Sequence, residues 1–233
     1  MTDIAARWAE LEERVARACA VVGRSAGEVA ILAAVKTRPP EQVVEVLAAG
    51  ARVLGHNRAQ ELAAVEPRVR ELWPGGYETH FIGALQTNKV NQVLRHATCV
   101  QSVDRIELAG KLSAAACRLE RTVEVFVEVN ASGEPTKAGV APEEALDLAG
   151  AVAALEGLRL RGLMTIGANS PDPGVVRAGF EEMSRLSAEL VGRSATAGAR
   201  ELSMGMSGDL DLAVAAGATM VRVGTALFGP RPS

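Results

Sequence analysis

The amino-acid sequence predicts an α/β protein, a single (β/α)8 barrel of the TIM type with an extra helix at its N-terminus. Runs rich in β-forming residues alternate with helical patterns along the chain, and this alternation implies parallel strands joined by right-handed crossovers. Eight such units can close into a barrel, whereas an open doubly wound sheet usually has about five or six strands. No G-x-G-x-x-G follows the first β-rich run at 29–35, which also favours the barrel over a dinucleotide-binding sheet.

Residues 1–25 are expected to form a helix that packs on the barrel. Apolar residues recur in this segment at helical spacing among charged residues: Ile4, Trp8, Leu11, Val15 and Ala18. The segment lacks the basic region followed by an apolar core that is typical of a signal peptide. One face of this helix is therefore predicted to dock on the rest of the protein.

The strands and helices of the barrel follow in order. The β-rich runs are 29–35, 51–54, 79–83, 98–102, 123–129, 159–165, 200–203 and 219–223. The helical patterns between them are 41–49, 57–72, 87–96, 104–119, 142–154, 174–191 and 208–216, and several open with Asp, Asn or Pro, which are favoured at helix starts. The longest stretches without a pattern, 73–78 and 167–173, are too short for interdomain linkers. We therefore expect residues 1–233 to form one domain.

Composition and charge exclude several classes of partner. The 233 residues are 48% hydrophobic and 23% charged, which is ordinary for a globular domain. The net charge is −3 and there is no run of Lys or Arg, so we expect neither nucleic-acid binding nor a polybasic membrane anchor. The most apolar later window, 148–155, is far shorter than the roughly 20 residues that span a bilayer. We expect a cytoplasmic protein with no membrane partner.

The cysteines point to a reducing compartment. Cys19, Cys99 and Cys117 are odd in number, widely spaced and set in apolar or helical contexts. This pattern argues against a disulfide framework and against a zinc site. All of them are expected to be reduced thiols in the core.

The carboxyl ends of the last two strands carry small residues. In barrels of this type the functional groups collect at the carboxyl ends of the strands, and phosphate is often bound after strands seven and eight. S-M-G-M-S-G occupies 203–208 and G-T occupies 224–225. Backbone N–H groups and hydroxyls in such turns can surround a phosphate near a helix N-terminus. Ordinary tight turns would explain the same glycines, but their place in the barrel favours a phosphate site.

A lysine ends the first strand at the same mouth of the barrel. Lys36 follows the apolar run 29–35, and a solvated surface lysine is the simple alternative for such a position. A lysine near a phosphate site suggests pyridoxal 5′-phosphate (PLP) held as a Schiff base, since burial promotes loss of the amine proton. Arg222 lies two residues before Gly224 and could point toward the cofactor ring; a surface ion pair is its alternative. Asn57 could equally be a turn-forming residue, and His80 could equally be a core histidine with its hydrogen bonds satisfied.

An ordered set of segments resembles one known family. The segments are A-V-K-T, G-H-N-R-A-Q-E, H-F-I-G-A-L-Q-T-N-K, S-V-D-R, V-E-V-N-A-S-G-E-P-T-K-A-G, L-R-G-L-M-T-I-G and L-S-M-G-M-S-G-D-L-D-L-A-V-A-A-G-A-T-M-V-R-V-G-T-A-L-F-G. In this order, from about residue 30 to residue 229, they resemble the pyridoxal phosphate homeostasis protein family. The resemblance implies a barrel like the N-terminal domain of alanine racemase, with PLP on Lys36 and Arg222 facing the pyridine nitrogen.

The same resemblance implies the remaining cofactor contacts. Phosphate contacts are expected from Ser207, Gly224 and Thr225, with Ser203 and Met206 in the same loop wall. The family segments that line the pocket correspond to Asn57, His80, Phe81, Ile82, Gly83 and Met164. One departure stands out, because the second motif usually reads G-E-N-R and here reads G-H-N-R, which places His56 where the family has an acid.

The resemblance implies a PLP-binding protein of vitamin B6 homeostasis and amino/keto acid balance, without a required catalytic role. An arginine opposite the pyridine nitrogen weakens the ring as an electron sink, and racemisation needs a second acid/base. In alanine racemase-like enzymes that base is a tyrosine from a further domain. The single tyrosine, Tyr77, precedes the third strand and so is expected at the wrong end of the barrel, and only Pro-Arg-Pro-Ser follows Gly229.

Two other functions are compatible with the sequence, and the sequence also suggests which partners to expect. A weak PLP-dependent amino-acid racemase would use Lys36 with a solvent or cysteine base. A lyase with a Schiff-base lysine, acting on a phosphosugar or a phosphate ester, would purify colourless. The expected partners are PLP and PLP-dependent apoenzymes, and the protein is expected to be a monomer.

Overall fold

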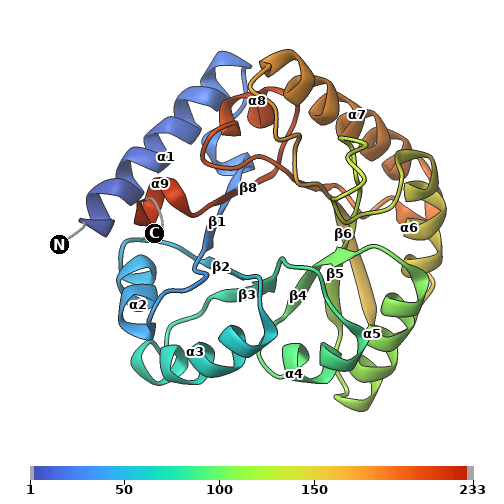
Figure 1. The fold of residues 1–233 in the computed structure, drawn as a ribbon, viewed down its shortest axis with the longest axis horizontal. Coiled ribbons are helices and arrows are strands. Elements are labelled where there is room, and N and C mark those ends of the chain that lie inside the picture. The colour runs from blue at the N-terminus through green and yellow to red at the C-terminus, as the bar shows by residue number, and fades with distance from the viewer. Residues whose placement is uncertain (1–2, 230–233) are drawn as a thin grey trace.

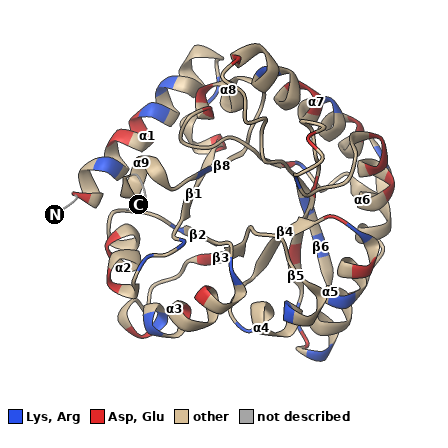
Figure 2. Cartoon of the chain, viewed as in Figure 1, with Lys and Arg blue, Asp and Glu red and all other residues tan. Residues whose placement is uncertain are grey.

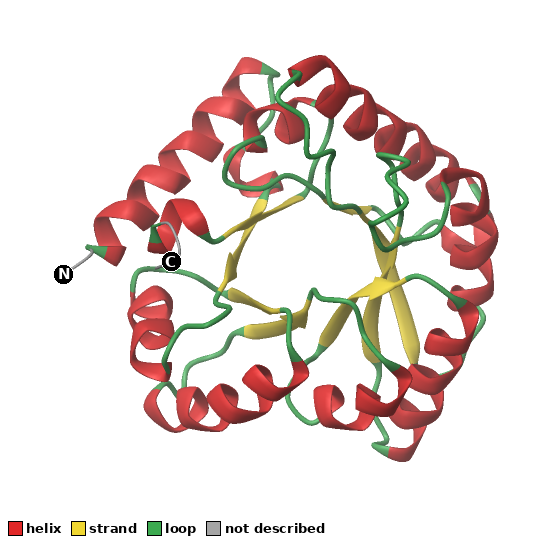
Figure 3. Cartoon of the chain, in the orientation of Figure 1, coloured by secondary structure: helices red, strands yellow, loops and turns green. Residues whose placement is uncertain are grey.

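The computed structural model describes residues 3–229, in which eight parallel strands close into a barrel surrounded by helices (Figures 1 and 3). The strands are β1 (Ala30–Ala34), β2 (Val53–His56), β3 (Glu78–Phe81), β4 (Cys99–Val103), β5 (Val123–Glu128), β6 (Leu158–Met164), β7 (Glu201–Ser203) and β8 (Met220–Val223). Each pairs with its neighbours in sequence, and β8 closes the barrel on β1. The predicted (β/α)8 barrel is confirmed.

The helices agree with the sequence patterns within a few residues. They are α1 (Ile4–Val21), α2 (Pro40–Ala48), α3 (Ala59–Leu72), α4 (Val90–Leu94), α5 (Ile106–Arg118), α6 (Ala145–Ala153), α7 (Pro173–Gly192), α8 (Leu210–Ala215) and α9 (Thr225–Phe228), with short 3-10 turns at Ala26–Glu28, Thr87–Lys89, Pro142–Glu144 and Ser194–Thr196. Two of those turns open the predicted helices 87–96 and 142–154. The sequence analysis missed α9, which it interpreted as a glycine turn, because so short a helix has no periodicity to detect.

Alternate residues of each strand face the helices and the barrel interior. On β5, Val125 and Val127 belong to the large core beneath the helices, whereas Phe126 packs with Cys99 and Met164 in a separate buried cluster. The interior of the barrel is therefore a packed layer. A ligand must bind above it, at one mouth of the barrel.

The N-terminal helix α1 completes the outer ring beside β1 and β8, where it packs on α2, α8 and α9 (Figure 1). Its buried face is the one expected from the spacing: Ile4, Trp8, Leu11, Val15 and Ala18. Asp3 caps the helix by accepting a hydrogen bond from the Ala6 N–H. Arg14 forms an ion pair with Asp211 on α8 and donates to the Ser207 carbonyl at 2.7 Å. The helix thus supports the loop that follows β7.

Charged residues of both signs are interspersed over α1, α3, α5 and α7 (Figure 2). Among the helices that the structure describes, none has the length and hydropathy that crossing a bilayer requires. The prediction of one domain over residues 1–233 includes residues 1–2 and 230–233, which lie outside the described part of the chain.

The prediction that every cysteine is a core thiol is wrong for Cys117. Cys19 and Cys99 are buried, and burial raises the pKa of the Cys99 thiol. Cys117 is exposed because it lies in the last turn of α5, on the face that points to solvent. All of them are free thiols, as expected.

Candidate functional site

A cavity of about 490 Å³ opens at the carboxyl end of the barrel, between the ends of β1, β2, β3 and β6 and the loops after β7 and β8. Seven residues that the sequence predicts as cofactor contacts line it: Lys36, Asn57, Met206, Ser207, Arg222, Gly224 and Thr225. Ile82 and Gly83 line it as well. The structure therefore brings the lysine, the arginine and both glycine-containing turns to one cavity.

The turn after β1 holds Lys36 in a strained loop. The next residue, Thr37, has φ of 63°, which is unusual for a β-branched residue. Its N–H donates to Glu61 Oε2 at 3.2 Å, and its hydroxyl donates to the Lys36 carbonyl at 2.6 Å. A carboxylate from α3 thus helps to fix the backbone beside Lys36.

Arg222 lies inside the barrel mouth and not in a surface ion pair. Its side chain is buried, and Nη1 donates to the carbonyl and hydroxyl of Ser203 at 2.7 and 2.8 Å. Nη2 donates to the Thr165 carbonyl at 2.6 Å. Burial lowers the pKa of Arg222 to about 10, against the opposing effects of Glu128 and Asp209. The guanidinium is therefore still a cation at neutral pH, held by neutral acceptors.

Glu128 is a buried acid near Arg222 that the sequence analysis missed. It ends β5 and is only 3% exposed. Burial raises the pKa of Glu128 to about 7, with a further rise caused by Asp104 and a smaller opposing effect of Arg222. The alternation V-E-V-F-V-E-V gave a signal, since it places Glu124, Phe126 and Glu128 on the face opposite the valines. That face is the barrel interior.

The raised pKa of Glu128 predicts a pH-dependent stability. Its folded-state pKa lies above the ordinary value, so the folded protein retains the proton while the unfolded chain releases it, and stability falls as pH rises from about 4.5 to 7. Glu128→Gln should remove this loss and stabilise the protein at pH 8 by on the order of 1 to 3 kcal/mol. Urea unfolding at pH 5 and pH 8 measures the effect. The exposed control Glu120→Gln should change neither value, and equal behaviour of the two variants would contradict the assignment.

The two turns that line the other side of the cavity are tied together. The Ala226 N–H in α9 donates to Ser207 Oγ at 3.1 Å. Among the described residues, no acceptor is found for the backbone N–H groups of Ser207, Gly208 and Thr225. Gly205 has φ of 91°, and a Cβ there would lie 2.4 Å from the Ala213 Cβ, so this turn requires glycine. Unpaired N–H groups beside two hydroxyls are suited to an anion.

Two further polar atoms at the cavity are buried without a partner among the described residues: Asn57 Oδ1 and Arg38 Nε. The Arg38 guanidinium also stacks over the Phe228 ring, with 4.7 Å to the centroid. Neither Arg38 nor Phe228 was predicted as a site residue. Arg38 could have been suspected, since it lies two residues after Lys36, whereas Phe228 enters the wall only because α9 folds back.

Four side chains that were expected at the pocket do not line the cavity. His80 and Met164 lie deeper in the barrel, where Met164 packs with Cys99 and Phe126. Ser203 lies beneath Arg222 and donates to Gln101 Oε1 at 2.7 Å. Phe81, also expected at the pocket, points to the outer core. A residue's place at the end of a strand did not predict how deep its side chain lies in the barrel. Neighbouring strands are staggered along the barrel axis, so their ends lie at different depths.

His56, the departure from the family motif, lies away from the cavity, between β2 and α3. Its Nε2 is 3.7 Å from Glu66 Oε2, too far for a hydrogen bond. Burial lowers the pKa of His56 to about 4, with a smaller contribution from His96. The imidazole is therefore neutral at pH 7 and brings no charge to the site.

Comparison with known proteins agrees with this geometry. The family model described as the N-terminal domain of alanine racemase matches residues 8–232. The pyridoxal phosphate homeostasis protein of Escherichia coli K12 is 38% identical over 232 residues, which cover 99% of this chain and 98% of the relative. The chain belongs to the pyridoxal phosphate homeostasis protein family. The sequence resemblance is thereby confirmed.

Solved structures share the fold of this family member closely. An unknown protein from Bifidobacterium adolescentis has a TM-score of 0.94 at 39% identity, with 97% of this chain and 94% of that chain covered. PipY of Synechococcus elongatus PCC7942, determined with PLP bound, has a TM-score of 0.82 at 32% identity, with 97% of this chain and 100% of that chain covered.

The single tyrosine of this pyridoxal phosphate homeostasis protein family member lies away from the cavity. Tyr77 directly precedes β3, and its hydroxyl donates to Glu66 Oε1 on α3 at 2.9 Å. Burial, together with Glu66, raises the pKa of Tyr77. Tyr77 is thus a neutral donor within the outer core.

Proposed function

We propose that the chain binds PLP as a Schiff base on Lys36 and serves intracellular PLP homeostasis and amino/keto acid balance. The observation that carries the proposal is that one cavity of about 490 Å³ is lined by Lys36, Arg222 and both turns with unpaired N–H groups. PLP supplies an aldehyde for a lysine amine and a phosphate for an anion site. The PLP-bound structure of PipY, a close structural neighbour, supports the same ligand.

The residues at the cavity fit this ligand. Lys36 would bind the aldehyde, and Ser207, Gly224 and Thr225 would hold the phosphate. Arg222 would donate to the pyridine nitrogen, since its guanidinium has more N–H groups than its acceptors in the protein use. Asn57, Met206 and Ile82 would contact the cofactor from the sides. Ser203 would act from below through its hydrogen bond with Arg222, whereas His80 and Met164 lie deeper and would not contact the ligand.

The arrangement favours a binding protein over a racemase. A cationic arginine at the pyridine nitrogen keeps that nitrogen unprotonated and limits stabilisation of negative charge at Cα. Tyr77 is committed to Glu66 in the outer core, and Glu128 does not line the cavity. With L-alanine in deuterated water, we expect negligible exchange at Cα. Exchange at a turnover rate on the order of 1 to 1,000 per second would instead establish the racemase.

The remaining expectations concern partners and location. We propose a cytoplasmic monomer that exchanges PLP with apoenzymes, and sedimentation and transfer assays test these points. The ligand itself is tested by the absorption spectrum of the protein after mixing with PLP and dialysis. A retained visible band is expected. A colourless protein would favour the phosphosugar lyase.

The phosphate turns give a second quantitative prediction. Ser207→Ala and Thr225→Ala should each weaken PLP binding by about 1 to 3 kcal/mol, the usual contribution of a hydrogen bond to a charged group. Fluorescence titration with PLP measures the dissociation constants. Ser170→Ala, which changes a hydroxyl outside the cavity, should leave affinity unchanged. Unaltered affinity in both cavity variants would mean that the phosphate binds elsewhere.

A further inference from the structure

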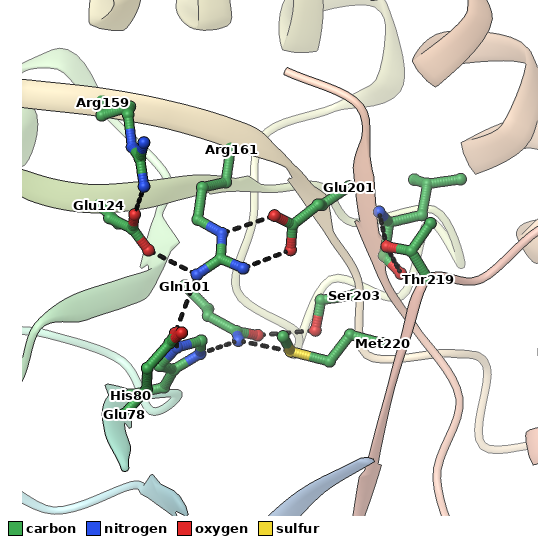
Figure 4. A network of polar contacts seen from close by, with 11 residues as sticks. Glu78, His80, Gln101, Glu124, Arg159, Arg161, Glu201, Ser203, Thr219 and Met220 are labelled. Carbon is green, nitrogen blue, oxygen red and sulfur yellow. Dashed lines mark hydrogen bonds and ion pairs between the residues drawn. The ribbon is translucent and has the colours of Figure 1, made fainter. Parts of the chain in front are cut away.

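A continuous line of hydrogen bonds crosses the barrel interior from Arg222, near the carboxyl end, to Glu78 at the amino end. Figure 4 shows the part of this line from Ser203 to Glu78. Arg222 Nη1 donates to Ser203 Oγ at 2.8 Å, and Ser203 Oγ donates to Gln101 Oε1 at 2.7 Å. Gln101 Nε2 lies 2.8 Å from His80 Nδ1, and His80 Nε2 lies 2.9 Å from Glu78 Oε2. We call these five residues the relay.

The Gln101 amide oxygen faces Ser203, and with this orientation the hydrogen bonds of the relay run in one direction. A guanidinium only donates and an ionised carboxylate only accepts. The Ser203 hydroxyl therefore accepts a hydrogen bond from Arg222 and donates one to the Gln101 amide oxygen. The Gln101 amide N–H must then donate to His80 Nδ1, which leaves His80 neutral with its proton on Nε2, donating to Glu78. Burial lowers the pKa of His80, in agreement with a neutral ring.

The amino end of the relay is firmly anchored. Glu78 Oε2 also accepts from Arg161 Nη1 at 3.0 Å, and Arg161 forms a paired contact with Glu201 at 2.7 and 2.9 Å (Figure 4). The hydrogen bond from His80 and the charge of Arg161 lower the pKa of Glu78, against the opposing effect of burial. Glu78 is therefore an ionised acceptor at neutral pH. The direction of hydrogen-bond donation along the relay is fixed at this end.

Gln101 is the central residue of this line. It extends from β4 across the interior to Ser203 on β7, and its amide also donates to Met220 Sδ on β8 at 3.2 Å. It is 0% exposed, so water cannot replace its contacts without entering the core. The part of this network from Arg222 to His80 is buried, and a buried, hydrogen-bonded network fixes one arrangement of its side chains.

We propose that Gln101 is a positioning residue that orients the Arg222 guanidinium toward the pyridine nitrogen, through Ser203. The proposal rests on the proposed function. Gln101 keeps the Ser203 hydroxyl turned away from Arg222, so that an oxygen lone pair always faces the guanidinium. Together with the Ser203 and Thr165 carbonyls, this hydroxyl holds Arg222 and leaves other N–H groups for the cofactor.

The test uses the absorption maximum of PLP bound to the protein, together with its pH titration. Gln101→Leu and Ser203→Ala should each shift both quantities and weaken PLP affinity about 5- to 30-fold, the factor that corresponds to one strong polar contact. The double variant should add little, because both changes break the same line. Cys99→Ala is the matched control: Cys99 is buried in the interior from the same strand but has no place in the relay.

The outcomes separate the relay from the proposed function. A wild-type protein without a visible band overturns the proposed function and this inference with it. A normal wild-type band, with Ser203→Ala behaving like Cys99→Ala, overturns the relay alone, and Ser203→Ala decides this even where Gln101→Leu fails to fold. Nitrogen-15 NMR of the protein without PLP gives an independent measurement of which His80 ring nitrogen carries the proton. We expect a neutral His80 protonated on Nε2, and an Nδ1-protonated or doubly protonated ring would contradict the relay.

Discussion

Lys36→Ala is expected to abolish the visible band of bound PLP while leaving a weaker, noncovalent complex. The proposed Schiff base needs the Lys36 amine, whereas the proposed anion site lies in the separate turns after β7 and β8. This one variant should therefore separate the covalent from the noncovalent contribution to PLP binding. The absorption spectrum reports the first and equilibrium dialysis with PLP reports the second.

A matched control for this variant comes from the other lysines, since the sequence contains only Lys36, Lys89, Lys111 and Lys137. Lys111→Ala removes an exposed lysine of α5 and should leave both the band and the affinity intact. A visible band that persists in Lys36→Ala would show that another amine carries the cofactor. Complete loss of noncovalent binding would show that the anion site is weaker than its geometry indicates.

Arg222→Met is expected to destabilise the protein without PLP by roughly 1 to 3 kcal/mol. It removes the donor to the buried Thr165 carbonyl, whereas the Ser203 carbonyl keeps its hydrogen bond from the Thr165 N–H. Arg222→Lys keeps the charge but cannot reach all of these acceptors, so it should lose less. Urea unfolding without PLP measures the free energy of unfolding of each variant.

Arg185, an exposed arginine that forms surface ion pairs, is the control for this effect on stability. Arg185 on α7 contacts Glu182 and Glu189 at the surface, where ion pairs contribute only about 0 to 1 kcal/mol. Arg185→Met should therefore cost little. A loss for Arg222→Met no larger than that for Arg185→Met would mean that Arg222 is not structurally held as described.

The strand order was predictable because parallel strands and their helices leave strong, repeating patterns. Each expected strand was found within a few residues, from 29–35 at β1 to 219–223 at β8. Strand ends converge at one mouth by topology alone, which is why Lys36 and Arg222 could be placed together without a structure. The short helix α9 left no pattern and was missed.

The interior of the barrel was much harder to predict. Both faces of a barrel strand are buried, so burial does not tell which face is the interior. Gln101 and Glu128 therefore looked like ordinary strand residues, and His80 was placed at the pocket and not beneath it. The contact between Glu61 and Thr37 depends on how α3 packs, which a linear pattern does not contain.

Borohydride reduction followed by peptide mass mapping identifies the lysine that carries PLP. Reduction converts a Schiff base between PLP and a lysine into a stable secondary amine, so the modified residue can be located in the digested protein. A single pyridoxyl adduct is expected, on Lys36. An adduct on Lys89, Lys111 or Lys137 in its place, or no adduct in protein that has been saturated with PLP, would contradict it.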